Sequence, residues 1–484
     1  MITPRALLQK IVILGDGQTG LMAAIALARS LPFAQIDIVT GDNGFSGFAD
    51  LACTALPFTN RLHDRFGLDE ATMVREAGAT HRIAVKYTDW GGPGTMGSAT
   101  YGAALPIQLR TAFARHWGGT ARRGDGGIGA LSLGEALAKE GRFAPPPPDA
   151  DGPLSELDYG LRWDRKAYMQ LLVARAAAAH VRHHKAPMAQ TIFNDAGIDT
   201  VTLSDGTTLN ADLWLDCSGE AARLISQVDG YARCDWSARL AVSRVAVVRG
   251  NRGQLSLDDR IGLTKAGWVA QTMGPDGQEA VLGLATGLDD VDARRLFGTD
   301  ALHFFDVKPG RVDKPWLGNV IALGDAAMQI EPLAWTNLDF AHRMIDLLLE
   351  MLPGREIHPL ERDEFNRRFV LMAEANCDFV ASHYAAPASA AFFGTPQMSE
   401  QLALCLEQYQ RRGKLPFIEE AAMAGREWHG VLRALGIAAG GDVVSRAEDE
   451  ASHRAALAEH QAMLAAVVRE LPPYDAWYRG VMQG

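Results

Sequence analysis

The feature that most constrains this chain is a glycine-rich turn, Gly15-Asp16-Gly17-Gln18-Thr19-Gly20, between an apolar run and an alanine-rich segment. Residues 10–14 have the composition of a buried strand, and residues 21–28 are typical of a helix. In such a turn the first glycine permits a tight bend, the second lets the backbone approach a diphosphate, and the third lets helix and strand pack closely. The turn therefore predicts a dinucleotide-binding fold with the diphosphate at the positive end of the helix. The expected cofactor-binding residues are Gly15, Gly17, Gln18, Thr19 and Gly20.

The end of the second predicted strand lacks the residue that usually follows this turn. Dinucleotide folds normally place an acidic residue there, where it binds the ribose of the adenosine. The strand predicted at residues 36–40 ends in Thr40, and Asp42 stands two residues later. Either the acid is displaced to Asp42 or the ribose contact is lost, and the sequence leaves both alternatives open.

Two later strand ends favour FAD over NAD as the cofactor. Asp216-Cys217-Ser218-Gly219 follows one apolar run, and Gly324-Asp325 follows another. In flavoprotein monooxygenases the aspartate of a Gly-Asp pair contacts the ribityl chain, and the next helix N-terminus faces the flavin or the phosphates. Each segment alone is also consistent with an aspartate-capped turn. The three motifs in this order predict an FAD site that includes Asp216, Gly219, Gly324 and Asp325.

Length and composition limit the class of protein. The chain has 484 residues, with 48% hydrophobic and 22% charged residues, which is typical of a soluble globular protein of several domains. A net charge of −11 argues against a nucleic-acid partner. No run approaches the ~20 apolar residues of a membrane span, and the N-terminal apolar run has no cleavage site after it. We therefore expect a cytoplasmic protein without a membrane partner.

The order of the predicted elements indicates an α/β fold with a Rossmann-like FAD-binding domain, a second β-sheet and a helical C-terminal part. We expect a discontinuous FAD-binding domain at residues 1–90, 160–235 and 310–345. Substrate-side insertions and the second sheet are expected at residues 91–159 and 236–309. The helical C-terminal region is expected at residues 346–484.

A group of histidines, His180, His183 and His184, resembles a metal cluster at first sight. The group closes the helix predicted at residues 164–179, where cations suit the negative end of the helix dipole. We therefore predict no metal site, although a metal remains the minor alternative.

Most of the chain resembles the flavin-dependent tryptophan halogenase family. The similar blocks are residues 11–24, 160–165, 212–219, 314–319, 331–333, 378–384 and 471–474. The resemblance implies an FAD-binding fold of the aromatic-hydroxylase and halogenase type, with reduced FAD (FADH2) supplied by a separate flavin reductase. It further implies oxygen, a halide and an aromatic substrate, with a lysine that relays hypohalous acid and a glutamate that helps to remove the ring proton. We also expect that the protein can form a homodimer.

The catalytic lysine of the family is replaced in this chain. Residues 81–87 are similar to the family's lysine strand, but Arg82 stands at the catalytic position and Lys86 matches a second, non-catalytic lysine. A guanidinium stays protonated at any working pH, so Arg82 cannot provide the neutral amine that a chloramine needs. Arg82 is then either a hydrogen-bond donor at the site or a packing or ion-pair residue. Lys86, about 13 Å along the same predicted strand face, is a candidate substitute.

The family's glutamate is missing as well. After Glu331-Pro332-Leu333 the chain reads Ala334-Trp335-Thr336-Asn337, where the family has Glu-Ser-Thr-Gly. Trp335 then fills the expected halide pocket, stacks on a bound ring or is a core side chain. Thr336 and Asn337 replace the family's halide-binding backbone, and we expect both to be cofactor-binding residues. Of the family's W-x-W-x-I-P block, which is thought to keep substrate away from the flavin, only Trp268 remains.

Three functions are compatible with this pattern. The leading hypothesis is a flavin-dependent oxygenase or halogenase-family enzyme acting on an aromatic or electron-rich substrate, with Arg82, Lys86 and Trp335 as candidate catalytic residues. Halogenation would lose two groups, and acid–base assistance alone contributes about 10²–10⁴-fold in rate. Hydroxylation by a flavin monooxygenase is favoured by the lost W-x-W-x-I-P block. A non-catalytic FAD-binding protein is the third alternative.

Overall fold

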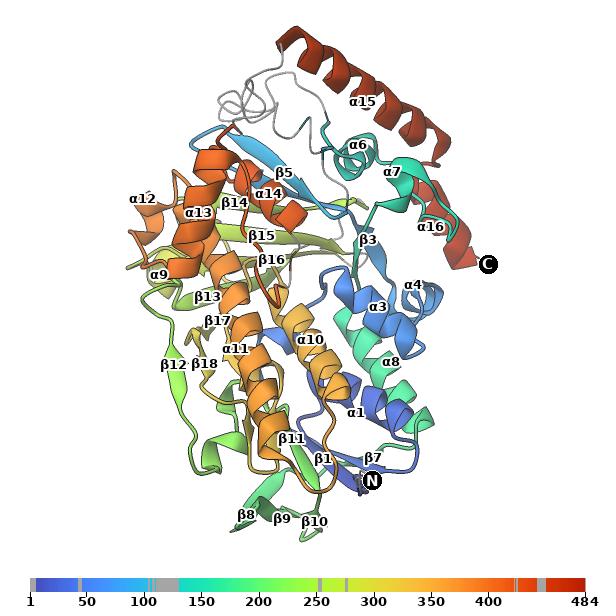
Figure 1. The fold of residues 1–484 in the computed structure, drawn as a ribbon, viewed down its shortest axis with the longest axis vertical. Coiled ribbons are helices and arrows are strands. Elements are labelled where there is room, and N and C mark those ends of the chain that lie inside the picture. Colours follow the sequence, from blue (N-terminus) through green and yellow to red (C-terminus); the bar gives the residue numbers. More distant parts are fainter. Residues whose placement is uncertain are drawn as a thin grey trace. The chain divides into compact units, whose positions relative to one another are not determined.

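The computed structural model describes residues 6–41, 46–102, 105–106, 109, 130–250, 255–274, 277–421, 423, 425–441 and 450–483. The chain forms two compact units, each assembled from three stretches of sequence (Figure 1). The first unit comprises Met1–Gly78, Trp163–Ser237 and Lys308–Asn376, and the second comprises Ala79–Arg162, Ala238–Val307 and Cys377–Gly484. The helical region expected at residues 346–484 is thus divided between the units.

The first unit is built on a six-stranded sheet in the order β19-β20-β11-β1-β2-β7. Its strands are β1 (Lys10–Leu14), β2 (Gln35–Val39), β7 (Arg182–His184), β11 (Leu213–Asp216), β19 (Trp316–Leu317) and β20 (Val320–Ala322). Neighbouring strands are parallel except β19, which is antiparallel to β20. The register places Leu14 beside both Val39 and Asp216, so the carboxyl ends of the central strands meet at one edge. Cofactors of dinucleotide-binding folds bind at this edge.

Helices cover this sheet because their apolar side chains are buried from water when they pack on the sheet and on one another. Helix α1 (Gln18–Ser30) is buried from Gln18 to Leu27 and packs against α8 (Arg165–Ala178) and α10 (Thr336–Glu350). The packing of α10 on α1 explains why the first part of the helical C-terminal region belongs to this unit. The strand, turn and helix predicted at the N-terminus are confirmed. The other helices here are α2 (Phe48–Leu51), α3 (Phe58–Arg65), α4 (Glu70–Ala77) and the beginning of α11 (Pro359–Ala381).

Two small sheets complete the first unit. One is the antiparallel sheet β8 (Met188–Asn194), β9 (Gly197–Leu203) and β10 (Thr208–Asn210), in which β9 and β10 form a hairpin around Asp205-Gly206. The other joins β12 (Arg233–Asp235), β18 (Gly310–Val312) and β21 (Met328–Gln329).

The second unit contains the predicted second sheet, with seven strands in the order β17-β13-β16-β15-β14-β4-β5. Its strands are β4 (Ala84–Thr88), β5 (Met96–Thr100), β13 (Arg244–Arg249), β14 (Asp258–Thr264), β15 (Gly267–Gly274), β16 (Gly277–Leu284) and β17 (His303–Asp306). All pairs are antiparallel except β4 with β14. A separate antiparallel pair joins β3 (Thr80–Arg82) to β6 (Gly160–Arg162).

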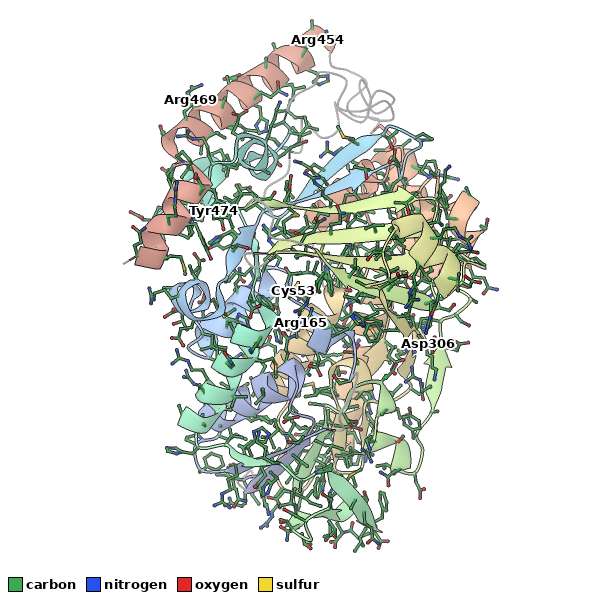
Figure 2. The ribbon with its side chains drawn as sticks, turned by 180° about the vertical axis from the view of Figure 1, so that it is seen from behind. Cys53, Arg165, Asp306, Arg454, Arg469 and Tyr474 are labelled. Atoms are coloured by element: carbon green, nitrogen blue, oxygen red, sulfur yellow. The ribbon has the colours of Figure 1, made fainter. Side chains whose placement is uncertain are left out.

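The helices of the second unit come mostly from the end of the chain. They are α6 (Leu133–Glu140), α7 (Gly152–Ser155), α9 (Asp290–Phe297), α12 (Ala390–Phe393), α13 (Glu400–Arg412), α14 (Gly425–Ala434), α15 (Glu450–Glu470) and α16 (Tyr474–Gln483). Helix α15 packs against α6 through a buried cluster that includes Leu137, Phe143, Leu464 and Val468. Figure 2 shows Arg454 and Arg469 along α15 and Tyr474 beyond it. No helix among the described residues is long and apolar enough to cross a membrane.

Two local predictions were wrong. Residues 82–87 do not form one strand, because β3 ends at Arg82 and pairs with β6, whereas β4 begins at Ala84 and pairs with β5 and β14. Arg82 and Lys86 therefore do not share one strand face. The predicted histidine-rich helix end is also different: α8 ends at Ala178, and His183 and His184 lie on β7 because that strand pairs with β2.

Candidate functional site

The glycine turn has the geometry that a dinucleotide site requires. Gly15 has φ +106°, and a Cβ there would lie 2.2 Å from the carbonyl oxygen of Cys217, while a Cβ on Gly20 would lie 1.9 Å from the carbonyl oxygen of Gly15. Both positions therefore exclude a side chain, and they hold β1, α1 and the end of β11 in close contact. Gly17 is the N-cap of α1 and provides no side-chain cap, so the first turn presents its backbone N–H groups.

A carboxylate already occupies the N-terminus of α1. The backbone N–H of Thr19 donates to Asp50 Oδ1 at 3.3 Å, and the hydroxyl of Ser46 donates to Asp50 Oδ2 at 2.6 Å. Burial raises the pKa of Asp50. Because the positive end of the helix holds an anionic group here, the site fits an anion such as the diphosphate of FAD. A diphosphate at this helix end would compete with Asp50 for the N–H of Thr19.

The end of β2 carries Thr40, as the sequence shows, and the hydroxyl of Thr40 donates to Asp16 Oδ2 at 3.0 Å. Asp42, the predicted displaced acid, lies outside the described residues. The glycine turn itself thus contributes a carboxylate at the place where the second strand lacks one.

Asp216 stabilises the turn that follows β11. Its Oδ1 accepts hydrogen bonds from the backbone N–H and the hydroxyl of Ser218, and its Oδ2 accepts from the backbone N–H groups of Leu224 and Ile225, at 2.6–3.0 Å. Burial raises the pKa of Asp216. Both carboxylate oxygens accept hydrogen bonds from the chain that follows, so Asp216 has the contacts of an aspartate that caps a turn, the alternative left open by the sequence. Gly219 has φ +73°, and a Cβ there would overlap the carbonyl oxygen of Ser46.

Asp325 lies in the turn after β20 and contacts α2. Its Oδ2 accepts a hydrogen bond of 2.8 Å from the backbone N–H of Ala49. Burial raises the pKa of Asp325 to about 7. Gly324, the partner of Asp325 in the predicted pair, has φ +61°. The carbonyl oxygen of Ser46 accepts a hydrogen bond from the backbone N–H of Glu220, which follows β11. Together with the contacts of Asp50 and Ala49, this bond joins the segment of residues 46–51 to the turns that follow β1, β11 and β20.

The N-terminus of α10 gathers buried polar atoms. Trp335 is 3% exposed and has φ +56°, a left-handed conformation that costs a non-glycine residue about 1–2 kcal/mol. Asn337 Nδ2 donates to the carbonyl oxygen of Ile330 at 3.0 Å. Within the described part of the chain, Trp335 Nε1, the Thr336 hydroxyl and Asn337 Oδ1 have no hydrogen-bond partner. Buried polar groups are rarely left unpaired, so this helix end fits a ligand with polar edges, such as the pyrimidine ring of a flavin.

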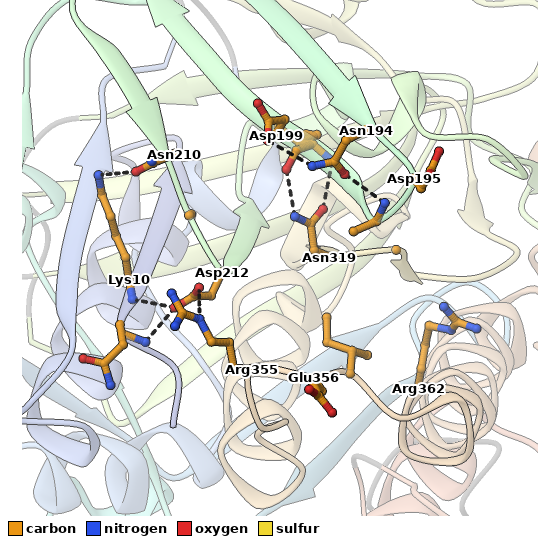
Figure 3. Close-up of a pocket in the computed structure, with 16 residues that line it drawn as sticks. Lys10, Asn194, Asp195, Asp199, Asn210, Asp212, Asn319, Arg355, Glu356 and Arg362 are labelled. Atoms are coloured by element: carbon orange, nitrogen blue, oxygen red, sulfur yellow. Dashed lines mark hydrogen bonds and ion pairs between the residues drawn. The ribbon is translucent and has the colours of Figure 1, made fainter. Parts of the chain in front are cut away.

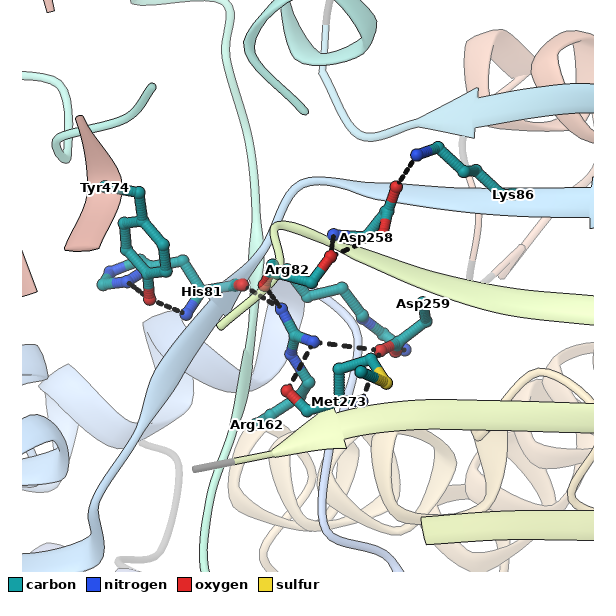
Figure 4. A network of polar contacts seen from close by, with 9 residues as sticks. His81, Arg82, Lys86, Arg162, Asp258, Asp259, Met273 and Tyr474 are labelled. Carbon is teal, nitrogen blue, oxygen red and sulfur yellow. Dashed lines mark hydrogen bonds and ion pairs between the residues drawn. The ribbon is translucent and has the colours of Figure 1, made fainter. Parts of the chain in front are cut away.

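Arg82 lies in a buried ion-pair cluster of the second unit (Figure 4). Its Nη1 is 3.1 Å from Asp259 Oδ2, and Arg162 Nη1 is 3.2 Å from Asp259 Oδ1. The three side chains are 2%, 4% and 0% exposed for Arg82, Asp259 and Arg162. Arg162 also donates to the carbonyl oxygens of Met273, His81 and Ser256. Arg82 is therefore a buried ion-pair residue, with its guanidinium also 5.4 Å from the ring of Tyr101.

Lys86 has a different environment. Its ammonium pairs with Asp258, the neighbour of Asp259 on β14, and the Lys86 side chain is 44% exposed whereas Asp258 is 4% exposed. Of the two basic residues on this segment, only Lys86 is thus accessible from solvent.

The strand that carries Arg82 is held by the C-terminal helix. The backbone N–H of His81 donates to the hydroxyl of Tyr474 at 2.7 Å, and His81 Nδ1 lies 3.1 Å from the same oxygen. Tyr474 begins α16 and stacks on Trp477 with ring centroids 6.0 Å apart. Sequence reasoning missed the partners Asp50, Asp258 and Asp259, because nothing local to an acidic residue indicates which distant group it contacts.

A large groove of the first unit lies away from the predicted site (Figure 3). It has a volume of about 750 Å³ and is lined by Lys10, Asp212, Asn319 and Arg355, among others. Lys10 begins β1, and Asp212 and Asn319 directly precede β11 and β20, so the groove is at the amino ends of the strands. Two of its charged side chains pair with each other, since Arg355 Nε donates to Asp212 at 2.9 Å. Among the described residues, no group of histidine, cysteine or acidic side chains is placed to hold a metal.

The mostly parallel sheet, the glycine turn and the polar helix N-termini at the strand ends define a protein of the dinucleotide-binding class. The chain matches the family model "Tryptophan halogenase" over residues 10–449 and therefore belongs to that family. Flavin-dependent halogenases use FADH2 supplied by a separate flavin reductase, and the protein is accordingly an FAD-dependent enzyme of the oxidoreductase kind. The family acts on aromatic substrates with a halide.

Individual relatives are distant but cover most of the chain. Tryptophan 7-halogenase KtzQ from Kutzneria sp. (strain 744) is 24% identical over 427 residues, which cover 78% of this chain and 76% of the relative. The solved structure of BrvH, a flavin-dependent halogenase from Brevundimonas sp. BAL3, has a TM-score of 0.87 at 23% identity and covers 98% of this chain and 99% of its own. Xcc4156, a flavin-dependent halogenase from Xanthomonas campestris, also has a TM-score of 0.87 at 23% identity, covering 98% of each chain.

Proposed function

We propose that this protein uses reduced FAD and oxygen to hydroxylate an aromatic or other electron-rich small molecule instead of halogenating it. The observation that carries the proposal is the buried pairing of Arg82 with Asp259 on the strand similar to the family's lysine strand. In the overall reaction, substrate-H, O₂ and FADH2 give substrate-OH, FAD and water. One oxygen atom enters the substrate, and the other leaves as water with the two electrons and two protons of the reduced flavin.

Relay of hypohalous acid through an amine is not available to Arg82. A guanidinium remains protonated, and Arg82 is 2% exposed with its Nη1 directed at a carboxylate. Ala334 offers no carboxylate to accept a ring proton, which removes assistance worth about 10²–10⁴-fold. Direct oxygen transfer needs no amine relay, so the loss of the lysine removes only halogenation. The ring proton leaves in both reactions, and in this protein it would have to pass to water or another group instead of a carboxylate at position 334.

The residues of the first unit would bind and orient the cofactor. Bound reduced FAD supplies the two electrons that reduce oxygen. The N–H groups at the start of α1 would hold the diphosphate, and the unpaired polar atoms of Trp335, Thr336 and Asn337 would hold the polar edge of the flavin. Trp335, buried beside that edge, would limit the space for a halide at the start of α10.

Halogenation through Lys86 is the second candidate. The 44% exposed side chain of Lys86 is the observation that favours it, since an accessible amine is what a relay requires. Its pairing with the buried Asp258 opposes it, because a chloramine forms on a neutral amine.

Product analysis under labelled oxygen separates these candidates. The protein would be supplied with a flavin reductase, FAD, NADH, ¹⁸O₂ and a panel of electron-rich indoles, pyrroles and phenols, with or without bromide. We expect a product heavier by one ¹⁸O atom, formed equally with and without bromide and by the variant Lys86→Gln. A brominated product that disappears in Lys86→Gln would establish the second candidate. Absence of any product across the panel, with the reductase still supplying reduced FAD, would favour a non-catalytic flavin-binding protein.

We further propose that the protein is cytoplasmic and forms a homodimer. Light scattering would test the dimer.

A further inference from the structure

A carboxylate stands beside the end of β2 although that strand ends without an acid. Asp16, the second residue of the glycine turn, is 26% exposed. Its Oδ2 accepts a hydrogen bond from the hydroxyl of Thr40 at 3.0 Å, and its Oδ1 accepts one from the backbone N–H of Gly41 at 3.2 Å. Asp16 is thus attached to the two residues that directly follow β2.

The same carboxylate is oriented from the other side by the edge strand β7. His183 Nε2 lies 2.9 Å from Asp16 Oδ2, and the Lys185 ammonium lies 3.1 Å from His183 Nδ1. β7 is placed there because it pairs in parallel with β2, with the backbone N–H of Thr40 donating to the carbonyl oxygen of His184. The contacts of Asp16 with the Thr40 hydroxyl, the Gly41 N–H and His183 Nε2 use about three of the roughly four acceptor positions of its carboxylate and leave one for a ligand.

We propose that Asp16 binds a ribose hydroxyl of the FAD adenosine, in place of the acidic residue that ends the second strand in other dinucleotide-binding proteins. The end of the second strand is where such a fold receives the ribose. A carboxylate that enters this place from the glycine turn instead of from the strand offers the same acceptor to the sugar. Asp16 is then a cofactor-binding residue that complements Thr40. The proposal rests on the FAD cofactor and not on the hydroxylation proposed above.

Asp37 provides a matched control within the same sheet edge. It lies on β2, three residues before Thr40, and its Oδ1 pairs with His184 Nε2 at 2.6 Å. Its side chain is 1% exposed, so it cannot reach a ligand. The substitution Asp37→Asn therefore removes a carboxylate and a histidine contact from β2 and β7 without removing a ribose acceptor.

The test compares the binding of ADP, 2′-deoxy-ADP and 3′-deoxy-ADP by isothermal titration calorimetry, with FAD as a competitor. We expect the unsubstituted protein and Asp37→Asn to prefer ADP over at least one deoxy analogue by about tenfold or more, as a hydrogen bond to a charged acceptor requires. Asp16→Asn should lose most of this preference and bind FAD about tenfold more weakly. The double substitution Asp16→Ala with Thr40→Glu should restore the preference by returning the acid to the strand end.

Several results would overturn the proposal. One is an Asp16→Asn variant that discriminates between the nucleotides as well as Asp37→Asn does. Another is a loss of discrimination in Asp42→Asn but not in Asp16→Asn, which would assign the ribose to the displaced acid. Failure of Thr40→Glu to restore the preference would show that the two positions do not exchange roles. Circular dichroism of each variant verifies the fold, and FAD affinity provides a readout that is independent of turnover.

Discussion

The substitution Asp259→Asn tests the buried cluster that occupies the predicted catalytic strand. Asp259 Oδ2 and Oδ1 lie 3.1 Å from Arg82 Nη1 and 3.2 Å from Arg162 Nη1, and all three side chains are at most 4% exposed. Removal of one partner from a buried ion pair typically costs about 3–5 kcal/mol, because the remaining charge stays buried. Asparagine still accepts one hydrogen bond, so we expect a loss of about 3 kcal/mol, and about 5 kcal/mol for Asp259→Ala.

The measurement is urea unfolding followed by tryptophan fluorescence and circular dichroism. Asp290→Asn is the matched control, because Asp290 pairs with Arg244 at 2.7 Å while the two side chains are 36% and 33% exposed. Exposed pairs contribute about 0–1 kcal/mol, so this control should barely change the unfolding midpoint. Equal effects of Asp259→Asn and Asp290→Asn would refute the reasoning that Arg82 is held by a buried charge.

Three further predictions concern the cofactor site and the accessible lysine. Asp50→Asn should tighten FAD binding by about tenfold in a fluorescence titration, because an anion at the N-terminus of α1 competes with the diphosphate for the same end of the helix; unchanged or weaker binding would contradict this. The pKa of Asp325 is raised to about 7 in the folded protein, above its ordinary value of 3.8. The unfolded chain therefore releases the proton first, and stability contributed by protonated Asp325 is lost as pH rises from about 4 to about 7. Asp325→Asn should then match the unsubstituted protein near pH 4 and exceed it by up to about 4 kcal/mol at pH 8, and equal melting temperatures at pH 8 would be the contrary result. Lys86→Gln should cost about 1–3 kcal/mol, because Lys86 is 44% exposed but its partner Asp258 is 4% exposed and stays buried without its cation; a loss as large as that of Asp259→Ala in urea would contradict this.

The features that sequence predicted well are local. The strand, glycine turn and helix at residues 10–28 depend on residues close together in the chain, so backbone preferences and the hydrophobic pattern were sufficient. The alternating pattern of residues 82–87 is local too, but the prediction of one strand was wrong. The chain forms two strands there, because β6 pairs with β3, which ends at Arg82, and β14 pairs with β4, which begins at Ala84.

The contacts that decide the site are long-range. Asp259 is 177 residues from Arg82, and Asp50 is 31 residues from Thr19. Asp259 on β14 and Asp50 on α2 have no local signature for such a partner, and only the folded chain determines which group each carboxylate contacts. The position of Asp16 was available in the sequence as an acid inside the glycine turn, but its contact with Thr40 required the register of β1 and β2.

The central claim is that reduced FAD on this protein passes oxygen, and not an oxidised halide, to its substrate. The most direct measurement mixes the protein with FAD reduced in advance, adds oxygen, and follows the flavin absorbance with and without bromide. We predict a time course that differs from that of free flavin and does not change with bromide concentration. Flavin oxidation that quickens with bromide would contradict this claim and would indicate that the protein halogenates its substrate.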